Sequence, residues 1–264
     1  MFRKKEKKEE MLPREDGLTD YNVYIMSRQE KVINIIIAAA VLFFVGYVFY
    51  QNWILSSILM VLSVKFPEIR TRQIIEKRKN QLTLQFKDML YSLSSALSVG
   101  KSVEMGIRDS LQDLQVIYPD PNTDILREIE YILRGLNMNN TIEEMFLQFA
   151  ERAHLEDVDN FVDIFVTCKR TGGDLIEVMR STSNTIGEKI EVKQEINMMI
   201  SGKKYEFNFM MILPVIMVEF LALTSEDYMK PVFTQIPGIA AMTAAIGIFA
   251  VAYIVGSKIM KIEL

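Results

Sequence analysis

Three long apolar segments divide the sequence, one in its amino-terminal part and two in its carboxyl-terminal part. Residues 32–50 are apolar apart from Asn34, and about 19 residues at about 1.5 Å each nearly cross a hydrocarbon core about 30 Å thick. Residues 207–223 and 236–257 are similar, and the first of these contains Pro214. We predict a transmembrane helix for each segment, with a kink at Pro214 because proline removes a backbone hydrogen bond.

A fourth apolar segment, residues 53–66, is shorter. About 14 residues fit either a tight second span or an interfacial helix. Lys65 can extend toward one headgroup layer and Trp53 can lie at the other, which favours a span. We therefore predict four transmembrane helices, arranged as an amino-terminal hairpin at residues 32–66 and a carboxyl-terminal pair at residues 207–257.

Basic residues predict how these helices are oriented. They flank the apolar segments at Arg28 and Lys31, at six positions from Lys65 to Lys79, at Lys203 and Lys204, and at Lys258 and Lys261. The two connecting loops at the other ends carry only Lys230. Both termini and the long central region are therefore predicted to be cytoplasmic.

The central region, residues 81–206, has the apolar spacing of amphipathic helices and no sustained alternation. Five stripes are predicted to form a core; they contain Leu82, Phe86, Met89, Leu90, Leu93 and Leu97; Ile125, Ile129, Ile132, Leu133 and Leu136; Ile142, Met145, Phe146 and Phe149; Phe161, Ile164, Phe165 and Cys168; and Leu175, Val178, Met179, Thr182, Ile186 and Ile190. We predict an all-α antiparallel bundle. A charged tail at residues 1–31, a basic linker at 67–80 and a short tail at 258–264 complete the chain.

Three junctions in this region share a pattern in which glycine precedes a helix-capping residue. The pattern is expected to end one helix and start the next. Its residues are Gly100 and Ser102; Gly135, Thr141 and Glu144; and Gly172, Gly173, Asp174 and Glu177. Thr141 with Glu144 fits a capping box, and Asp174 with Glu177 is the aspartate version of it.

Charge and composition exclude several functions. Residues 81–200 carry 20 Asp and Glu against 11 Lys and Arg, so nucleic acid would be repelled and a basic protein surface is the better complement. The chain contains one cysteine, which cannot form an intramolecular disulfide, and one histidine, His154, which rules out the usual multi-histidine metal sites.

Motifs that suggest chemistry are incomplete. SALSVGKS, residues 95–102, has Ser95 in place of the first glycine of a nucleotide-binding loop and follows a helix rather than a strand. Cys168 has no nearby base and is expected to be a buried apolar residue. EDVDNFVD, residues 156–163, lacks the glycine and final glutamate of a calcium loop. We expect no cofactor, no metal and no catalytic residue.

Glu219 is an ionisable residue within the apolar segment at residues 207–223. A carboxyl group there is costly unless it is paired or reaches water. Two interpretations stay open: the side chain extends to the outer headgroup layer, or it contacts a partner helix or a translocating substrate.

Four segments together resemble a known family: LSSALSVGKSVEMGI, LRGLN with TIEEMFLQFAER, CKRTGGDLIEVM with the long helix after it, and YMKPVFTQIPG with the terminal MKIEL. In combination they are similar to the F-domain family of type II secretion and type IV pilus systems, and in particular to TadB-like platform proteins of tight-adherence (Tad/Flp) pili. The resemblance covers roughly residues 81–264. Asp174 departs from the Asn or Glu that is frequent in relatives.

The resemblance implies a non-enzymatic multi-pass protein of the cytoplasmic membrane. Its F domain would contact a hexameric secretion ATPase and couple ATPase motion to the insertion of pilin subunits into a filament. Relatives with two F domains imply that this chain pairs with a second, TadC-like F-domain subunit or with copies of itself. Membrane lipid is a further expected partner, and nucleic acid is not.

We expect the helix that begins after Asp174 to carry the motion toward the membrane, with Gly202 as a flexible point. An alternative function is a four-span transporter or channel subunit in which Pro214 and Glu219 line a path.

Overall fold

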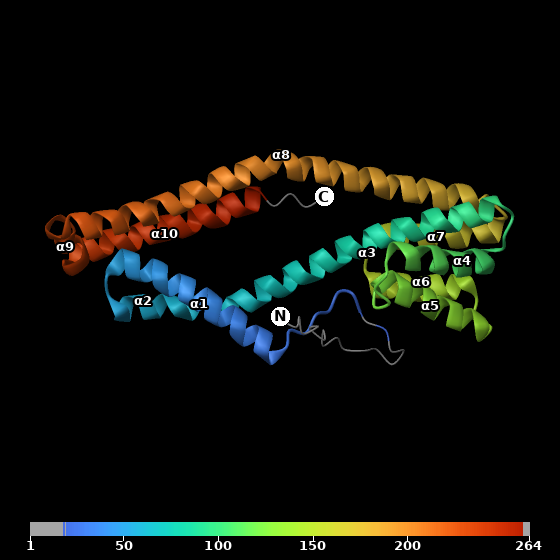
Figure 1. Cartoon of the computed structure of the whole chain (residues 1–264), viewed down its shortest axis with the longest axis horizontal. Helices are drawn as coiled ribbons and strands as arrows, with labels where there is room; N and C mark the ends of the chain where they lie inside the picture. Colours follow the sequence, from blue (N-terminus) through green and yellow to red (C-terminus); the bar gives the residue numbers. More distant parts are fainter. Residues whose placement is uncertain (1–17, 19, 261–264) are drawn as a thin grey trace. The chain divides into compact units, whose positions relative to one another are not determined.

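The computed structural model describes Leu18 and residues 20–260, and every regular element in this part of the chain is a helix. Contacts divide these residues into two units (Figure 1). The bundle unit contains the described residues up to Ser27 together with Arg70–Val192, and the apolar unit contains Arg28–Ile69 and the described residues from Lys193 onward. The prediction of an all-α protein is confirmed.

The bundle unit is built from short amphipathic helices between two long ones. Its complete helices are α4 (Val103–Ile117), α5 (Asp124–Asn137), α6 (Ile142–Ala153) and α7 (Glu156–Thr171). The two long helices, α3 (Phe66–Ser98) and α8 (Leu175–Thr224), each continue into the apolar unit. The basic segment at residues 67–80 is therefore part of α3 and not a separate linker.

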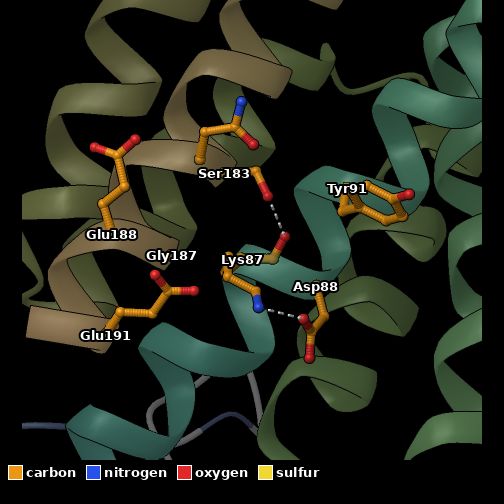
Figure 2. A pocket seen from close by; sticks show the side chains of 8 residues that line it. Lys87, Asp88, Tyr91, Ser183, Gly187, Glu188 and Glu191 are labelled. Carbon is orange, nitrogen blue, oxygen red and sulfur yellow. Dashed lines mark hydrogen bonds and ion pairs between the residues drawn. The ribbon is translucent and has the colours of Figure 1, made fainter. Parts of the chain in front are cut away.

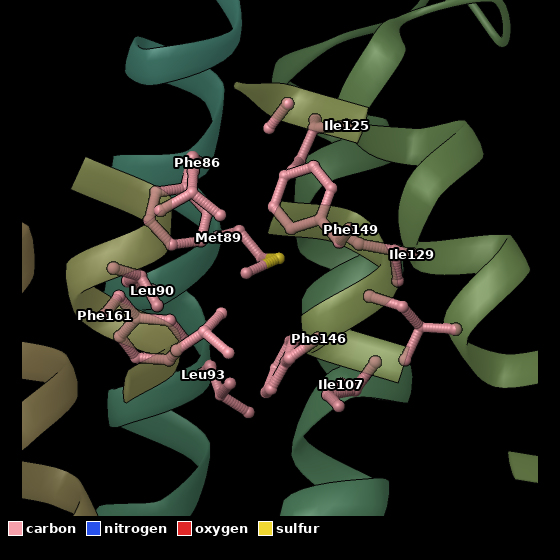
Figure 3. Close-up of a cluster of buried hydrophobic side chains, with 14 of the residues drawn as sticks. Phe86, Met89, Leu90, Leu93, Ile107, Ile125, Ile129, Phe146, Phe149 and Phe161 are labelled. Carbon is pink, nitrogen blue, oxygen red and sulfur yellow. The ribbon is translucent and has the colours of Figure 1, made fainter. Parts of the chain in front are cut away.

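The core of the bundle is formed by the apolar faces of these helices (Figure 3). Phe86, Phe146, Phe149, Phe161 and Phe165 are fully buried, and the Phe146 and Phe165 rings meet edge to face with centroids 5.0 Å apart. Rings in this geometry add to the stabilisation from burial alone.

The predicted stripes supply most of this core. Ile164 differs from expectation because it is exposed. Several other stripe residues are only partly buried: Leu133, Leu136, Cys168, Leu175, Val178, Thr182 and Ile190. Helix α4 contributes to the same core through the buried Ile107 and Leu114, which belong to none of the predicted stripes.

The predicted charged tail, residues 1–31, includes residues that belong to the folded part of the chain. Residues 1–17 and 19 lie outside the described part of the chain, so the prediction for them is untested. The prediction of a solvated tail is wrong for the segment that follows, because Leu18, Tyr21 and Met26 are buried in the bundle unit and α1 begins at Arg28.

The apolar unit contains three helices that are long and apolar enough to cross a membrane. These are α1 (Arg28–Tyr50), α8 and α10 (Ile236–Ile259), which correspond to three of the predicted spans. The short helix α9 (Glu226–Thr234) precedes α10, and residues 261–264 lie outside the described part. Pro214 lies inside α8 without interrupting its helical assignment.

The fourth predicted span is not one long helix. Residues 53–66 form α2 (Trp53–Met60) and a 3₁₀ segment, η1 (Val61–Lys65), and the chain then continues into α3. Asn52 caps α2 by accepting a hydrogen bond from the Ile54 N–H at 2.9 Å. Eight α-helical residues rise only about 12 Å, so α2 alone cannot cross a bilayer.

The α2–η1 segment nevertheless packs along α1. Gly46 of α1 lies against the buried Ser56, and a Cβ atom at residue 46 would be 3.1 Å from Ser56 Cα and 2.9 Å from Leu59 Cδ1. Trp53 contacts Phe43 and Tyr47 of α1 edge to face, while Ile54 and Ile58 of α2 are exposed apolar residues. Residues 28–65 therefore form a closely packed hairpin with an apolar outer surface.

Candidate functional site

The bundle unit has a pocket of about 470 Å³ between α3 and the first part of α8 (Figure 2). The α8 side is tied to α3 by the Ser183 hydroxyl, which donates to the Lys87 carbonyl oxygen at 3.1 Å. Gly187 presents no side chain to the pocket, and a Cβ atom there would be 3.8 Å from Lys87 Cδ. The residues that line it are Lys87, Asp88, Tyr91, Ser183, Asn184, Gly187, Glu188 and Glu191.

Acidic groups outnumber basic groups in this pocket, with Asp88, Glu188 and Glu191 against Lys87. Lys87 Nζ lies 3.2 Å from Asp88 Oδ1, so one carboxylate is already paired. Within the described residues, the Glu188 and Glu191 carboxylates form no hydrogen bond or ion pair, and both side chains are exposed. The pocket therefore offers two free carboxylates to a positively charged group.

The rim of the pocket is aromatic on the α3 side. Tyr91 is 68% exposed, which leaves its ring free for contact. One turn earlier, Asp88 Oδ2 accepts a hydrogen bond from the Tyr118 hydroxyl at 2.6 Å, and burial together with this carboxylate raises the pKa of Tyr118. Carboxylates beside an exposed tyrosine suit an arginine or lysine side chain, which pairs with the former and stacks on the latter.

None of the residues that line the pocket is a cysteine or histidine, and the half-buried Cys168 lies near the end of α7. Over Leu18 and residues 20–260, no cluster of three or more His, Cys, Asp or Glu is placed to hold a metal ion.

The first predicted helix junction has the expected geometry. Gly100 has a φ of 84°, in the left-handed region, where a side chain would be strained. Ser102 then caps α4 by accepting a hydrogen bond from the Met105 N–H at 3.3 Å.

The second junction is capped as predicted but turns at a different residue. Thr141 Oγ1 accepts from the Glu144 N–H and the Glu144 carboxylate accepts from the Thr141 N–H, so the capping box is present. Gly135 does not adopt the predicted left-handed conformation. It is buried inside α5 against the Met145 side chain, with no room for a Cβ atom, and Asn139 takes the left-handed conformation with a φ of 67°.

The third junction connects α7 to α8. Gly172 ends α7 with a φ of 75°, and the Gly173 N–H donates to the Cys168 carbonyl oxygen at 2.8 Å. Asp174 Oδ1 accepts from the N–H groups of Ile176 at 2.9 Å and Glu177 at 3.2 Å. The reciprocal bond from the Glu177 side chain is absent among the described contacts, so only half of the predicted box forms.

A buried polar network was missed by the sequence analysis. Glu128 of α5 and Arg152 of α6 are 0% and 1% exposed, and their ion pair is 2.5 Å long. The Tyr21 hydroxyl donates to Glu128 Oε1 at 2.9 Å, and the Arg152 guanidinium lies 4.8 Å from the centre of the Tyr131 ring. A signal was present, because Glu128 stands between Ile125 and Ile129 within a predicted apolar stripe.

Burial and hydrogen bonding have opposing effects on the pKa of Glu128. Burial raises this pKa, and the hydrogen bonds from Arg152 and Tyr21 oppose the rise. Burial also raises the pKa of the Tyr21 hydroxyl, and the Glu128 charge adds to the rise. The Glu128 carboxylate accepts hydrogen bonds from three donors: Arg152 Nε, Arg152 Nη2 and the Tyr21 hydroxyl. Hydrogen bonds to the charged form of a carboxyl group favour its ionisation.

The predicted intramembrane site contains one unsatisfied group. Glu219 of α8 is half-buried, and its Oε2 atom is buried without a hydrogen-bond partner among the described residues. Val215 and Val218, on the preceding turn, pack in a cluster with Val48 and Phe49 of α1. Pro214 is exposed.

A model of the family described as "Type II secretion system (T2SS), protein F" matches residues 89–223, just over half of the chain. No curated protein and no solved structure matched the chain. The matched residues run from the last part of α3 through α4 to α7 and along α8 to Leu223. They contain all three junctions, Glu219 and the pocket residues other than Lys87 and Asp88. The chain belongs to the type II secretion system protein F family.

Proposed function

We propose that this protein is the cytoplasmic-membrane platform of a Tad-type pilus or related secretion system, where it couples a hexameric secretion ATPase to pilin insertion. Membership of the protein F family implies a platform role in a type II secretion or type IV pilus-like system. The Tad assignment, the ATPase, the pilin and a second F-domain subunit are inferences from the sequence resemblance.

The observation that carries this proposal is the continuity of α8. This helix has 50 residues, and Met179, Ser183 and Ile186 of its first part are buried in the bundle. Its last part has the apolar composition of a membrane span. An unbroken helix transmits displacement along its axis, so a force on the bundle would reach the span without passing through a loop.

The orientation follows from contacts within the bundle unit. Tyr21 precedes α1, and it bonds to Glu128 and Arg152, which follow the first hairpin. Residues on both sides of residues 28–69 therefore lie on the same side of a membrane. If α1 crosses the membrane, the α2–η1 segment with the first turn of α3 would return, and the basic residues from Arg70 to Lys79 favour the cytoplasm for this side.

Cysteine accessibility tests this orientation. We expect a cysteine at residue 51, between α1 and α2, to react with an impermeant maleimide in intact cells, and one at residue 91 to react only after lysis. Cys168→Ser removes the native thiol first. The opposite pattern, or labelling of both positions in intact cells, contradicts the proposed topology.

The pocket between α3 and α8 is the proposed contact for a basic surface of the ATPase. Glu188 and Glu191 are exposed and unpaired within the described part of the chain, beside exposed Tyr91. We expect Glu188→Lys with Glu191→Lys to abolish filament assembly, and Glu195→Lys, an exposed position on the same helix outside the pocket, to have a smaller effect.

Stiffness of α8 provides the direct test of the coupling mechanism. Met198 and Met199 are each 70% exposed and lie between the two parts of the helix. Replacing both with glycine weakens the helix by about 2 kcal/mol relative to replacing both with alanine. We expect normal filament assembly with the alanine pair and defective assembly with the glycine pair; equal assembly by both contradicts the mechanism.

A transporter or channel subunit is the second candidate, because the Glu219 Oε2 atom is buried and unsatisfied among the described residues. Glu219→Gln keeps the side-chain size and removes the charge. Loss of ion flux from liposomes containing the protein without an ATPase favours this alternative. If filament assembly is unchanged by Glu219→Gln, the Glu219 charge has no role in the platform mechanism.

A further inference from the structure

The segment immediately before α1, which contains Leu18 and residues 20–27, is seated on the bundle unit. We call this segment the strap. Leu18, Tyr21 and Met26 are 3%, 2% and 4% exposed, which is the burial of core residues. A segment with that burial is an integral part of the domain on which it lies.

Tyr21 anchors the strap through both its backbone and its side chain. Its N–H donates to the Arg152 carbonyl oxygen at 3.1 Å, and its hydroxyl donates to Glu128 Oε1 at 2.9 Å. The Arg78 guanidinium lies 4.7 Å from the centre of the ring. The tyrosine thus joins α3, α5 and the end of α6 at one point.

The strap also completes the buried ion pair. Glu128 is fully buried, and hydrogen bonds to a buried carboxylate offset the loss of water. Arg152 donates one bond to each carboxylate oxygen, and Tyr21, from outside the helices, donates a second bond to Oε1. The bundle therefore contains a polar socket that its own amino-terminal segment fills.

Contacts at the surface hold the strap on both sides of Tyr21. His154 Nε2 lies 3.2 Å from Asp20 Oδ1, and Lys79 Nζ donates to Asn22 Oδ1 at 3.1 Å. The strap ends at Ser27, and α1 begins at the next residue, Arg28. No linker separates the docked segment from the membrane helix.

We propose that the strap is a third connection between the bundle and the membrane, which couples α1 to the bundle independently of α3 and α8. Both ends of the first hairpin are then held by one domain, its beginning through the strap and its end through α3. A displacement of the bundle acts on α1 as directly as on α8. The inference uses the membrane orientation proposed above, and it does not depend on the identity of the ATPase or pilin.

The test is native-state hydrogen exchange of the full chain in detergent micelles. Urea below the unfolding midpoint is added, and exchange is followed at the amides of residues 20–27 and 32–36. In the wild type we expect both groups of amides to lose protection together with the core amides of α5, because all three are connected.

Two insertions separate connection from docking. A six-residue Gly-Ser insertion between Ser27 and Arg28 should leave the Tyr21 amide protected from exchange. The exchange rates at residues 32–36 should then no longer follow the opening of α5 as urea is added. The same insertion between Glu10 and Met11 is the matched control and should behave as the wild type does. Coupled exchange of residues 32–36 in the first insertion overturns the proposal.

Tyr21→Ala tests the anchor itself. Truncation of this buried ring should accelerate exchange at residues 20–27 by about a hundredfold or more and uncouple residues 32–36. Tyr21→Phe keeps the ring and should accelerate exchange by only about tenfold, for the loss of one hydrogen bond to a charged group. Rapid exchange of residues 20–27 in the wild type also overturns the proposal. None of these outcomes depends on filament assembly, so the proposed function can fail separately.

Discussion

Replacing Arg152 with methionine isolates the cost of an uncompensated charge in the bundle. Methionine retains the unbranched apolar stem of the side chain but removes two of the three hydrogen bonds that reach Glu128. Because those bonds oppose the effect of burial, the pKa of Glu128 should rise further in the variant. The carboxylate, which is 0% exposed, cannot turn to water.

Breaking one side of a buried ion pair costs about 3–5 kcal/mol. With a urea m-value of about 1.5 kcal/mol/M, the unfolding midpoint of the bundle should fall by about 2–3 M. A carboxyl whose pKa is raised in the folded state destabilises the fold when ionised, so this deficit should shrink as the pH falls through that pKa.

Restoring apolar complementarity should recover most of the loss. Arg152→Met combined with Glu128→Leu and Tyr21→Phe removes the charges and the hydroxyl that needs an acceptor, leaving no unpaired polar group in the socket. Replacing a buried pair by apolar groups of similar volume is often close to neutral. The triple variant should therefore be more stable than Arg152→Met alone, although it contains more substitutions.

Pulse proteolysis of the full chain in urea measures these midpoints from cleavage within the bundle. Lys189→Met is the matched control, because Lys189 is 44% exposed and its pair with Asp157, 3.0 Å long, should contribute less than about 1 kcal/mol. A midpoint for Arg152→Met no lower than that of Lys189→Met, or a triple variant less stable than the single one, refutes the reasoning.

Three further predictions concern single contacts. Thr141→Ala removes the hydroxyl that accepts from the Glu144 N–H, one of the two bonds of the capping box, and should lower the stability of the bundle by about 1 kcal/mol in the same proteolysis assay. Gly202→Ala meets no atom within 4 Å and should stiffen α8 by about 1 kcal/mol; filament assembly that is unchanged by this variant rules out a hinge at Gly202. Burial raises the pKa of Glu143, but the hydrogen bond from Lys169 at 2.8 Å, a backbone hydrogen bond and the charges of Lys169 and Arg170 together hold this pKa below its usual range. The pair should therefore stabilise the bundle above about pH 4.3 and lose its effect as the pH falls through the lowered pKa, by a few tenths of a kcal/mol that Lys169→Met removes.

The bundle core could be predicted from sequence because helical periodicity reports which residues face inward. Phe86, Phe146 and Phe161 stand at stripe positions, and all three are fully buried. Periodicity is less informative at the edges of a stripe. Ile164 lies next to Phe165 in the sequence but on the exposed side of α7, and no local signal distinguishes the two.

Glycine had two different roles that look the same in sequence. Gly100 and Gly172 adopt the left-handed conformation, where glycine avoids a steric cost. Gly135 was predicted to do the same, but it is needed for close packing against Met145, and Asn139 makes the turn instead. A glycine is needed either for close packing or for a left-handed backbone conformation. Tertiary contacts decide between the two, and the neighbouring residues in the sequence do not reveal them.

The strap was missed for a related reason. Tyr21 directly follows a densely charged part of the sequence, and its burial depends on partners more than 100 residues away, such as Glu128. An unpaired glutamate within the Ile125–Ile129 stripe indicates that a partner exists, but the sequence cannot show that Arg152 and Tyr21 supply it.

The length of the second hairpin arm, from α2 to the first turn of α3, fits the return across the membrane that we propose. Eight residues in α2 rise about 12 Å, and the five in η1 rise about 10 Å because a 3₁₀ helix rises about 2.0 Å per residue. The first turn of α3, up to Ile69 at the unit boundary, adds about 6 Å. The sum of about 28 Å is close to a hydrocarbon thickness of about 30 Å, so in the proposed topology Lys65 would reach the cytoplasmic headgroups. The proposed second crossing would then consist of three short pieces, which a search for one long apolar helix does not recognise.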